Sequence, residues 1–236
     1  AAAHDLDLEL IAGIEFSSNL DGHEIHILGL FVDENNGGLN ECARQSRRFR
    51  HKRAGEIVDL LNNLGIGIEL ADIEAVAGSG SIGRPHIASV LVDHGTTVTK
   101  KEAFRRFIGN EGPAFVPKPT VAAEEVINVV HDAGGVAILA HPASSRVRQE
   151  EIGTLAGFGL DGFEIAHPKH SPSASKKLKR LIEEMGLLPS GGSDFHGPGV
   201  GATRLGEFAV SLEWLEALRI AAMEHRSNAL STEETE

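Results

Sequence analysis

The chain has 236 residues, with 34 acidic and 22 basic side chains and a formal net charge of −12. This length supports one large core, or a core with an inserted module. The acidic balance excludes a general nucleic-acid-coating surface but still allows one local basic pocket. The single cysteine, Cys42, excludes an intrachain disulfide framework. It fits a reducing compartment, so we expect a cytoplasmic protein.

Two aliphatic runs near the start predict the first strands. They cover residues 8–16 and 25–32, and the turn-forming sequence Asn19-Leu20-Asp21-Gly22 lies between them. Apolar and β-branched runs bounded by turn residues are typical of strands. Glu15 lies inside the first run, and a buried carboxylate there would require a metal or a basic partner.

Between residues 41 and 108 the pattern changes from strand to helix. One helical face is apolar and is followed by Gly65, a residue typical of helix ends; its members are Ile57, Leu60, Leu61 and Leu64. Thr99 and Glu102 have the spacing of a capping box. We therefore expect residues 41–112 to form a helical insertion lobe.

After this lobe, strands and helices alternate. The pattern predicts helices over 121–133, 173–185 and 212–224, strands over 136–140, 159–165, 187–190 and 207–210, and a disordered tail over 229–236. Such alternation predicts a mainly parallel sheet or a barrel, whose active site lies where strands end.

Carboxylates and imidazoles recur at or near the ends of these strands. Glu15 and His26 belong to the first two runs, His141 follows the third, and Asp194-Phe195-His196 follows a later one. Together these groups suit Zn, Mn or Fe, and a carboxylate can bridge two ions. The sequence therefore predicts that these five side chains converge into a metal site at one end of the fold.

The chain resembles the PHP (polymerase and histidinol phosphatase) superfamily, within its branch of small metallophosphoesterases acting on nucleotides and RNA ends. The segments that carry the resemblance cover residues 13–15, 25–29, 83–88, 134–142 and 191–197. It implies a distorted seven-stranded β/α barrel with a helical insertion. The barrel would comprise residues 1–40 and 113–228.

The resemblance also assigns the metal ligands. Glu15 would be the bridging carboxylate, His26 and His141 would complete one ion position, and Asp194 and His196 would serve the others. The ions would be Mn, Zn, Fe or Mg, up to three in an intact enzyme. The family's His-x-His and Asp-His motifs are absent before Glu15, where only His4 occurs. We therefore expect an N-terminally truncated chain without its first strands, with weak metal binding and little or no activity.

Other residues are expected to contact substrate. Arg84 and His86 flank Pro85 at a helix start, and a helix N-terminus with a guanidinium suits phosphate. By the family resemblance, Lys118 and His170 would also face the pocket. His196 or His170 would protonate the leaving oxygen.

The function implied is hydrolysis of a nucleotide phosphate ester by metal-activated water. The substrate would be a nucleoside 3′,5′-bisphosphate, converted to a 5′-monophosphate, or short RNA degraded from its 5′ end. No membrane or stable duplex nucleic acid is expected as a partner. Two alternatives remain open: a non-catalytic remnant that binds metal or nucleotide, and a barrel-type metal-dependent amidohydrolase.

Overall fold

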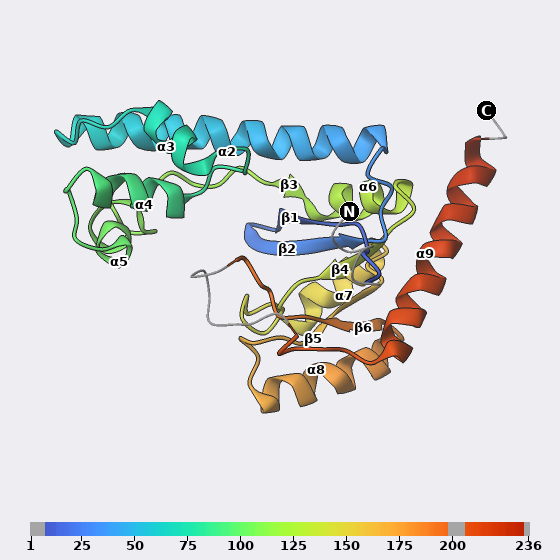
Figure 1. Ribbon diagram of the computed structural model, residues 1–236. Coiled ribbons are helices and arrows are strands. Elements are labelled where there is room, and N and C mark those ends of the chain that lie inside the picture. The colour runs from blue at the N-terminus through green and yellow to red at the C-terminus, as the bar shows by residue number, and fades with distance from the viewer. Residues whose placement is uncertain (1–7, 198–205, 234–236) are drawn as a thin grey trace. The chain divides into compact units, whose positions relative to one another are not determined.

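The computed structural model describes residues 8–197 and 206–233, and these form two compact units (Figure 1). The first unit comprises Ala1–Cys42 together with Val121–Glu236, and the second comprises Ala43–Thr120. The second unit includes the segment expected as an insertion, and it continues to Thr120 rather than ending near residue 112.

The first unit is built on a six-stranded mixed sheet. In the order β3-β1-β2-β4-β5-β6, its strands are β3 (Val121–Ala122), β1 (Gly13–Leu20), β2 (His23–Leu30), β4 (Val136–Leu139), β5 (Gly162–Ala166) and β6 (Leu188–Gly191). The pairs β1–β2 and β2–β4 are antiparallel, and the other three pairs are parallel. The predicted α/β class is confirmed. A seven-stranded barrel is not: among the described residues no ladder joins the edge strands β3 and β6.

Strands β1 and β2 form a hairpin whose position differs from the prediction. Residues 8–12 lie outside any strand, and β1 continues through Ser17, Ser18 and Asn19 to Leu20. Asp21 and Gly22 have φ angles of 49° and 87°, as a two-residue hairpin turn requires. The buried Ser18 hydroxyl donates to the Val121 carbonyl at 2.9 Å. Pairing on both sides of β1 therefore accommodates a polar segment that the apolar pattern did not identify.

After residue 120, the helices described in the first unit are α6 (Ala123–Asp132), α7 (Gln149–Gly157), α8 (Pro172–Met185) and α9 (Leu212–Glu233). All four residues of β4 are buried. Helix α9 contributes Leu218 and Ala222 to a core cluster with Val136 and Ile138. Within the described residues, no helix is both long and apolar enough to cross a bilayer.

The C-terminal segment corrects two predictions. Residues 207–210 form bends and irregular structure, not a strand, and half of these residues are exposed, so pairing would gain little apolar burial. Helix α9 continues to Glu233, through most of the segment expected to be disordered. Residues 234–236 lie outside the described part.

The second unit is helical. It contains most of α2 (Gly37–Asn63), with α3 (Leu70–Ala77), α4 (Arg84–Asp93), α5 (Lys100–Ala103) and the short π-helix η1 (Phe104–Ile108). Its core includes Ile57, Leu61, Ile73, Leu91 and Ile108. The Glu102 amide donates to Thr99 Oγ1 at 3.1 Å, which supports the predicted cap. Burial raises the pKa of the Cys42 thiol to about 11, so this cysteine is a packing residue.

Glu151 connects the hairpin to α7. Its carboxylate accepts a hydrogen bond from the Arg148 amide at 2.7 Å and contacts His23 Nδ1 at 3.0 Å. Hydrogen bonds from Arg148 and His23 lower its pKa to about 2. This stabilisation is fully present above the unfolded value of about 4.5, and it is lost as the pH falls toward 2.

We therefore expect Glu151→Ala to reduce the free energy of unfolding by about 1 kcal/mol at pH 7. The difference from wild type should shrink as the pH falls below about 4.5. Thermal melts followed by circular dichroism between pH 3 and 7 measure both effects. Glu150→Ala, one residue earlier in the same exposed turn, is the control; an equal loss there would contradict the assignment to Glu151.

Candidate metal centre

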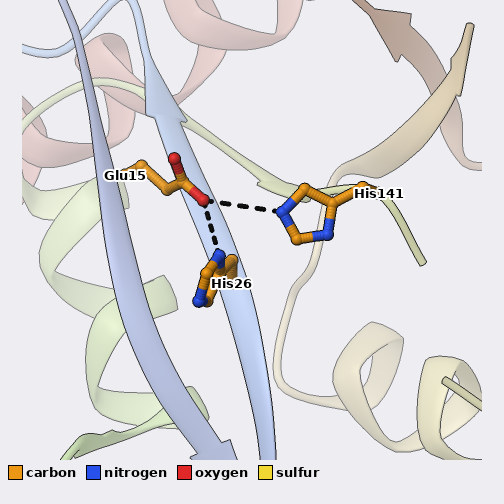
Figure 2. A group of neighbouring side chains, drawn as sticks. All are labelled: Glu15, His26 and His141. Atoms are coloured by element: carbon orange, nitrogen blue, oxygen red, sulfur yellow. Dashed lines mark ion pairs between the residues drawn. The ribbon is translucent and has the colours of Figure 1, made fainter. Parts of the chain in front are cut away.

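Glu15 and His26 lie on neighbouring strands of the hairpin (Figure 2). In the antiparallel register Ser17 is opposite His26, so Glu15 is the diagonal neighbour of His26 on the same face. His26 Nδ1 lies 2.7 Å from Glu15 Oε1, and its Nε2 lies 3.4 Å from Glu24 Oε1. The hairpin register alone therefore places a carboxylate against an imidazole.

His141 reaches the same carboxylate from the other side. It follows β4, which pairs with β2, and the Ala140 amide donates to the His26 carbonyl at 2.9 Å. His141 Nε2 lies 3.6 Å from Glu15 Oε1, as Figure 2 shows. Its Nδ1 hydrogen-bonds Ser145 Oγ at 2.9 Å, which orients the ring.

Asp194 and His196 form a second group with Glu15. One donor atom from each of the three lies within 4.8 Å of the others. The same holds for Glu15, His26 and His141, so Glu15 is common to both groups. His196 Nδ1 donates to the Asp194 carbonyl oxygen at 2.8 Å, which orients the ring. The structure thus brings together the five predicted ligand residues.

Two of these residues have strained backbones. His141 and Asp194 have φ angles of 33° and 50°, in the left-handed region that non-glycine residues rarely adopt. Such strain costs on the order of 1–3 kcal/mol per residue and persists where the surrounding structure determines the conformation. At both positions a strand ends and the chain turns, which directs these side chains toward Glu15.

The electrostatics favour ionised carboxylates at this site. Hydrogen bonds from His141 and His26 hold the pKa of Glu15 well below its usual range, although burial opposes the effect. Burial also opposes ionisation of Asp194, but the Lys169 hydrogen bond and the nearby positive charges lower its pKa overall. Both groups are therefore anionic and able to bind a cation at neutral pH.

Glu164 supports His141 from β5. Its Oε2 accepts a hydrogen bond from the His141 amide at 2.8 Å. Burial raises the pKa of Glu164 to about 7. Glu164 faces the backbone of His141 rather than its ring, so it holds the strained turn in place. The sequence predicted no role for Glu164, which lies within β5.

The segment after β5 extends the site with three side chains, those of His167, Lys169 and His170. His167 and His170 continue a row of imidazoles with His26 and His141, with successive ring centroids 5.1, 5.3 and 5.2 Å apart. The His167 side chain is fully buried, burial lowers its pKa to about 4, and its Nε2 lies 3.5 Å from Asp194 Oδ2. Lys169 Nζ donates to the same oxygen at 2.9 Å. The sequence predicted no role for His167 or Lys169, although both follow a strand end as His141 and Asp194 do.

His170 was predicted to contact substrate. Its Nδ1 donates to the Ile165 carbonyl at 3.1 Å, and its Nε2 is buried with no hydrogen-bond partner among the described residues. The ring nitrogens of His23 contact Glu151 and the Ser145 carbonyl. His4 lies outside the described residues.

No family model matches the chain. The chain is 34% identical over 201 residues to a 5′-3′ exoribonuclease of Haemophilus influenzae, covering 84% of this chain and 73% of that protein. It is 32% identical over 197 residues to the 5′-3′ exoribonuclease Rnm of Escherichia coli, covering 82% of this chain and 67% of that protein. The chain belongs to the PHP family of phosphoesterases.

Further PHP comparisons agree. The chain is 29% identical to a 3′,5′-nucleoside bisphosphate phosphatase of Chromobacterium violaceum, covering 87% of this chain and 74% of that protein. A solved structure from Bifidobacterium adolescentis, described as a metal-dependent phosphoesterase, has a TM-score of 0.82 at 29% identity, covering 93% of this chain and 79% of that one. The PHP family enzymes named here are hydrolytic phosphoesterases.

The donor set fits the divalent ions that a PHP phosphoesterase implies. Carboxylate and imidazole donors suit Zn, Mn and Fe. Ligands of one ion lie roughly 2.0–2.2 Å from it, so their atoms cannot be more than about 4.4 Å apart. The 3.6 Å between Glu15 and His141 lies within that limit. The residues present can therefore hold a divalent ion.

The phosphate-binding residues predicted from the PHP resemblance lie in the second unit. Arg84 Nη1 donates to the Ile108 carbonyl at 3.2 Å and to Asn110 Oδ1 at 2.9 Å. His86 Nδ1 accepts from the Gly83 amide at 3.0 Å and so caps α4. Lys118 precedes β3 and is half-buried. Their substrate roles remain predictions.

Proposed function

We propose that this PHP phosphoesterase hydrolyses a nucleoside 3′,5′-bisphosphate to the 5′-monophosphate, or short RNA from its 5′ end. The observation that carries the proposal is the sharing of Glu15 between two donor groups, one with His26 and His141 and one with Asp194 and His196. A carboxylate in that position suits two neighbouring cations, and a pair of cations is suited to phosphate-ester hydrolysis. The relatives named above act on these two kinds of substrate.

The protein's own residues would have separate roles in metal binding, proton transfer and substrate binding. A bound divalent ion would supply Lewis-acid activation of water and neutralise phosphate charge. Glu15, His26 and His141 would hold one ion, and Asp194 and His196 would serve the others, up to three. His196 or His170 would donate a proton to the leaving oxygen. Arg84, His86 and Lys118 would bind the substrate phosphates.

We further propose that the six strands correspond to part of the distorted seven-stranded barrel of the family. The strand order agrees with the placement of donors at one end: Glu15 and His26 share a sheet face, and His141 and Asp194 follow β4 and β6. The helical lobe would then select the substrate.

Assay of the purified 236-residue chain with added Mn²⁺, Zn²⁺ or Mg²⁺ tests the function. The chain should release phosphate from adenosine 3′,5′-bisphosphate, or mononucleotides from the 5′ end of a short oligoribonucleotide. Metal content would be measured on the same sample. Stoichiometric metal without hydrolysis of either substrate would favour a metal-binding remnant. Cleavage of C–N substrates alone would favour an amidohydrolase. A solved structure from Chromobacterium violaceum is described as an amidohydrolase. It has a TM-score of 0.78 at 27% identity, and the match covers 93% of this chain and 80% of that one.

Arg84→Lys tests the phosphate role. The guanidinium lies above the Phe104 ring at 5.6 Å and is held by two oxygen acceptors, so its planar fork is preorganised for an anion. We expect KM to rise about 10- to 100-fold with a smaller change in kcat. Arg106→Lys is the control, because Arg106 also lies over an aromatic ring, that of Phe107 at 4.8 Å. Equal KM and kcat values for wild type and Arg84→Lys would contradict the proposed contact between Arg84 and the substrate phosphate.

A further inference from the structure

Helix α2 carries a high density of positive charge for a chain of net charge −12. Six of the ten residues from 44 to 53 are Arg or Lys, and none is Asp or Glu. These six are part of only 22 basic side chains in the whole sequence. Such a cluster indicates a ligand with several negative charges. The net charge of the whole chain does not reveal this local cluster of basic residues.

The cationic residues share one helical face. Their spacing of three, four, seven and eight residues is that of a continuous stripe; its members are Arg44, Arg47, Arg48, His51 and Lys52. Further along the same helix, Ala54, Ile57 and Leu61 are buried in the core of the second unit. All five residues of the stripe are exposed. The stripe therefore faces solvent.

A groove of about 550 Å³ lies alongside this stripe. One wall consists of Arg47, Arg48, His51 and Lys52, and the other includes Glu74 and small residues between positions 77 and 82. Gly78 and Gly80 on that wall carry no side chain to narrow it. The acidic Glu74 contacts His51 Nε2 at 2.7 Å, so one anion faces one imidazole and the arginine and lysine charges still dominate.

We propose that this groove binds the sugar–phosphate backbone of single-stranded RNA. The choice of RNA rests on the proposed function. The stripe spans eight residue steps, roughly 12 Å of helix, so its charges can meet more than one phosphate. A basic groove that follows the backbone is the usual sequence-independent way to hold a single strand. A nucleoside bisphosphate, with one nucleoside, would gain nothing from it.

Fluorescence anisotropy with a 3′-fluorescein 12-mer oligoadenylate tests the proposal on the 236-residue chain in EDTA, which removes the metal ions needed for hydrolysis. Arg47→Ala/Lys52→Ala should weaken binding at least about tenfold and reduce the slope of log K against log salt by about 1.4, since each lost single-strand contact contributes about 0.7. Lys176→Ala/Lys177→Ala, which removes two exposed charges from α8 (Pro172–Met185), should change neither quantity. Melting temperatures of both variants should match wild type.

Each other outcome is decisive. Equal affinity for wild type and Arg47→Ala/Lys52→Ala, or equal losses in the two double variants, would overturn the groove as an RNA site. Displacement of the RNA by polyglutamate as readily as by unlabelled oligoadenylate would show an acidic-protein surface instead. Hydrolysis of adenosine 3′,5′-bisphosphate should be the same in all three proteins. If the wild-type chain bound RNA but, with metal added, hydrolysed neither adenosine 3′,5′-bisphosphate nor a short oligoribonucleotide, the proposed function would fail and the groove would still stand as an RNA site.

Discussion

Replacing Glu15 by Gln is expected to lower phosphate-ester hydrolysis about 1000-fold, equivalent to about 4 kcal/mol of transition-state stabilisation. Glu15 is the one residue shared by both donor groups, and its carboxylate lies 2.7 Å from His26 and 3.6 Å from His141. An amide of the same shape keeps the packing but removes the negative charge that a bridging ligand supplies. Metal content measured by plasma mass spectrometry should fall together with the rate.

Glu24→Gln is the matched control for this experiment. Glu24 also contacts His26, but at the other ring nitrogen, 3.4 Å away, and its side chain is 48% exposed. If Glu15 acted only as a counter-charge for His26, both substitutions would have comparable effects. We expect Glu24→Gln to retain wild-type metal content and turnover within about twofold. Unchanged metal content in Glu15→Gln would show that the two donor groups do not bind metal through this carboxylate.

Replacing Asp161 by Ala is expected to destabilise the first unit by about 3 kcal/mol. Asp161 accepts hydrogen bonds from His131 on α6 and His225 on α9, each at 2.8 Å, and from the Ala137 amide at 2.7 Å. The substitution would leave three partly buried donors without their acceptor. Ala137 is near the start of β4 and His141 follows its end, so the cluster lies away from the candidate metal centre.

This cluster fits a hydrogen-bonded clamp better than a second metal site. The rings of His131 and His225 stack with centroids 3.9 Å apart and planes within 15° of parallel. The lone pair of an imidazole nitrogen lies in the plane of the ring. Because the two ring planes are nearly parallel and stacked, the nitrogen lone pairs do not converge on one ion. The two imidazoles instead reach the two oxygens of one carboxylate, and α6 and α9 are joined through it.

The clamp has a defined pH dependence. Burial opposes ionisation of Asp161, but hydrogen bonds from His131, His225 and Ala137 lower its pKa overall. Its stabilisation is therefore fully present above the unfolded pKa of about 3.8 and is lost as the pH falls below it. Urea unfolding at pH 7 measures the loss of stability, and urea unfolding at pH 3 measures its decline. Asp132→Ala, at the exposed end of α6, should change stability by less than about 0.5 kcal/mol; a similar loss there would contradict the clamp.

Local sequence was sufficient for features that depend on neighbouring residues. The Thr99–Glu102 cap, the end of α2 before Gly65 and the helical character of the second unit follow from side chains within one or two turns. The same is true of the placement of His141 two residues after β4 and of Asp194 three residues after β6. The strand predicted over 207–210 failed because four residues in a row do not reveal whether a neighbouring strand is available to pair with them.

The sequence by itself determined which residue types occur at the strand ends, and so the kind of chemistry that this protein can support. Only the tertiary structure decided which of them meet. Glu15 contacts His26 because of the hairpin register, and it reaches His141 because β2 pairs with a strand more than one hundred residues later. Glu164, His167 and Lys169 join the site through β5 and its following turn in the same way. Strand register is set by long-range pairing and by burial of one sheet face, which no local pattern contains.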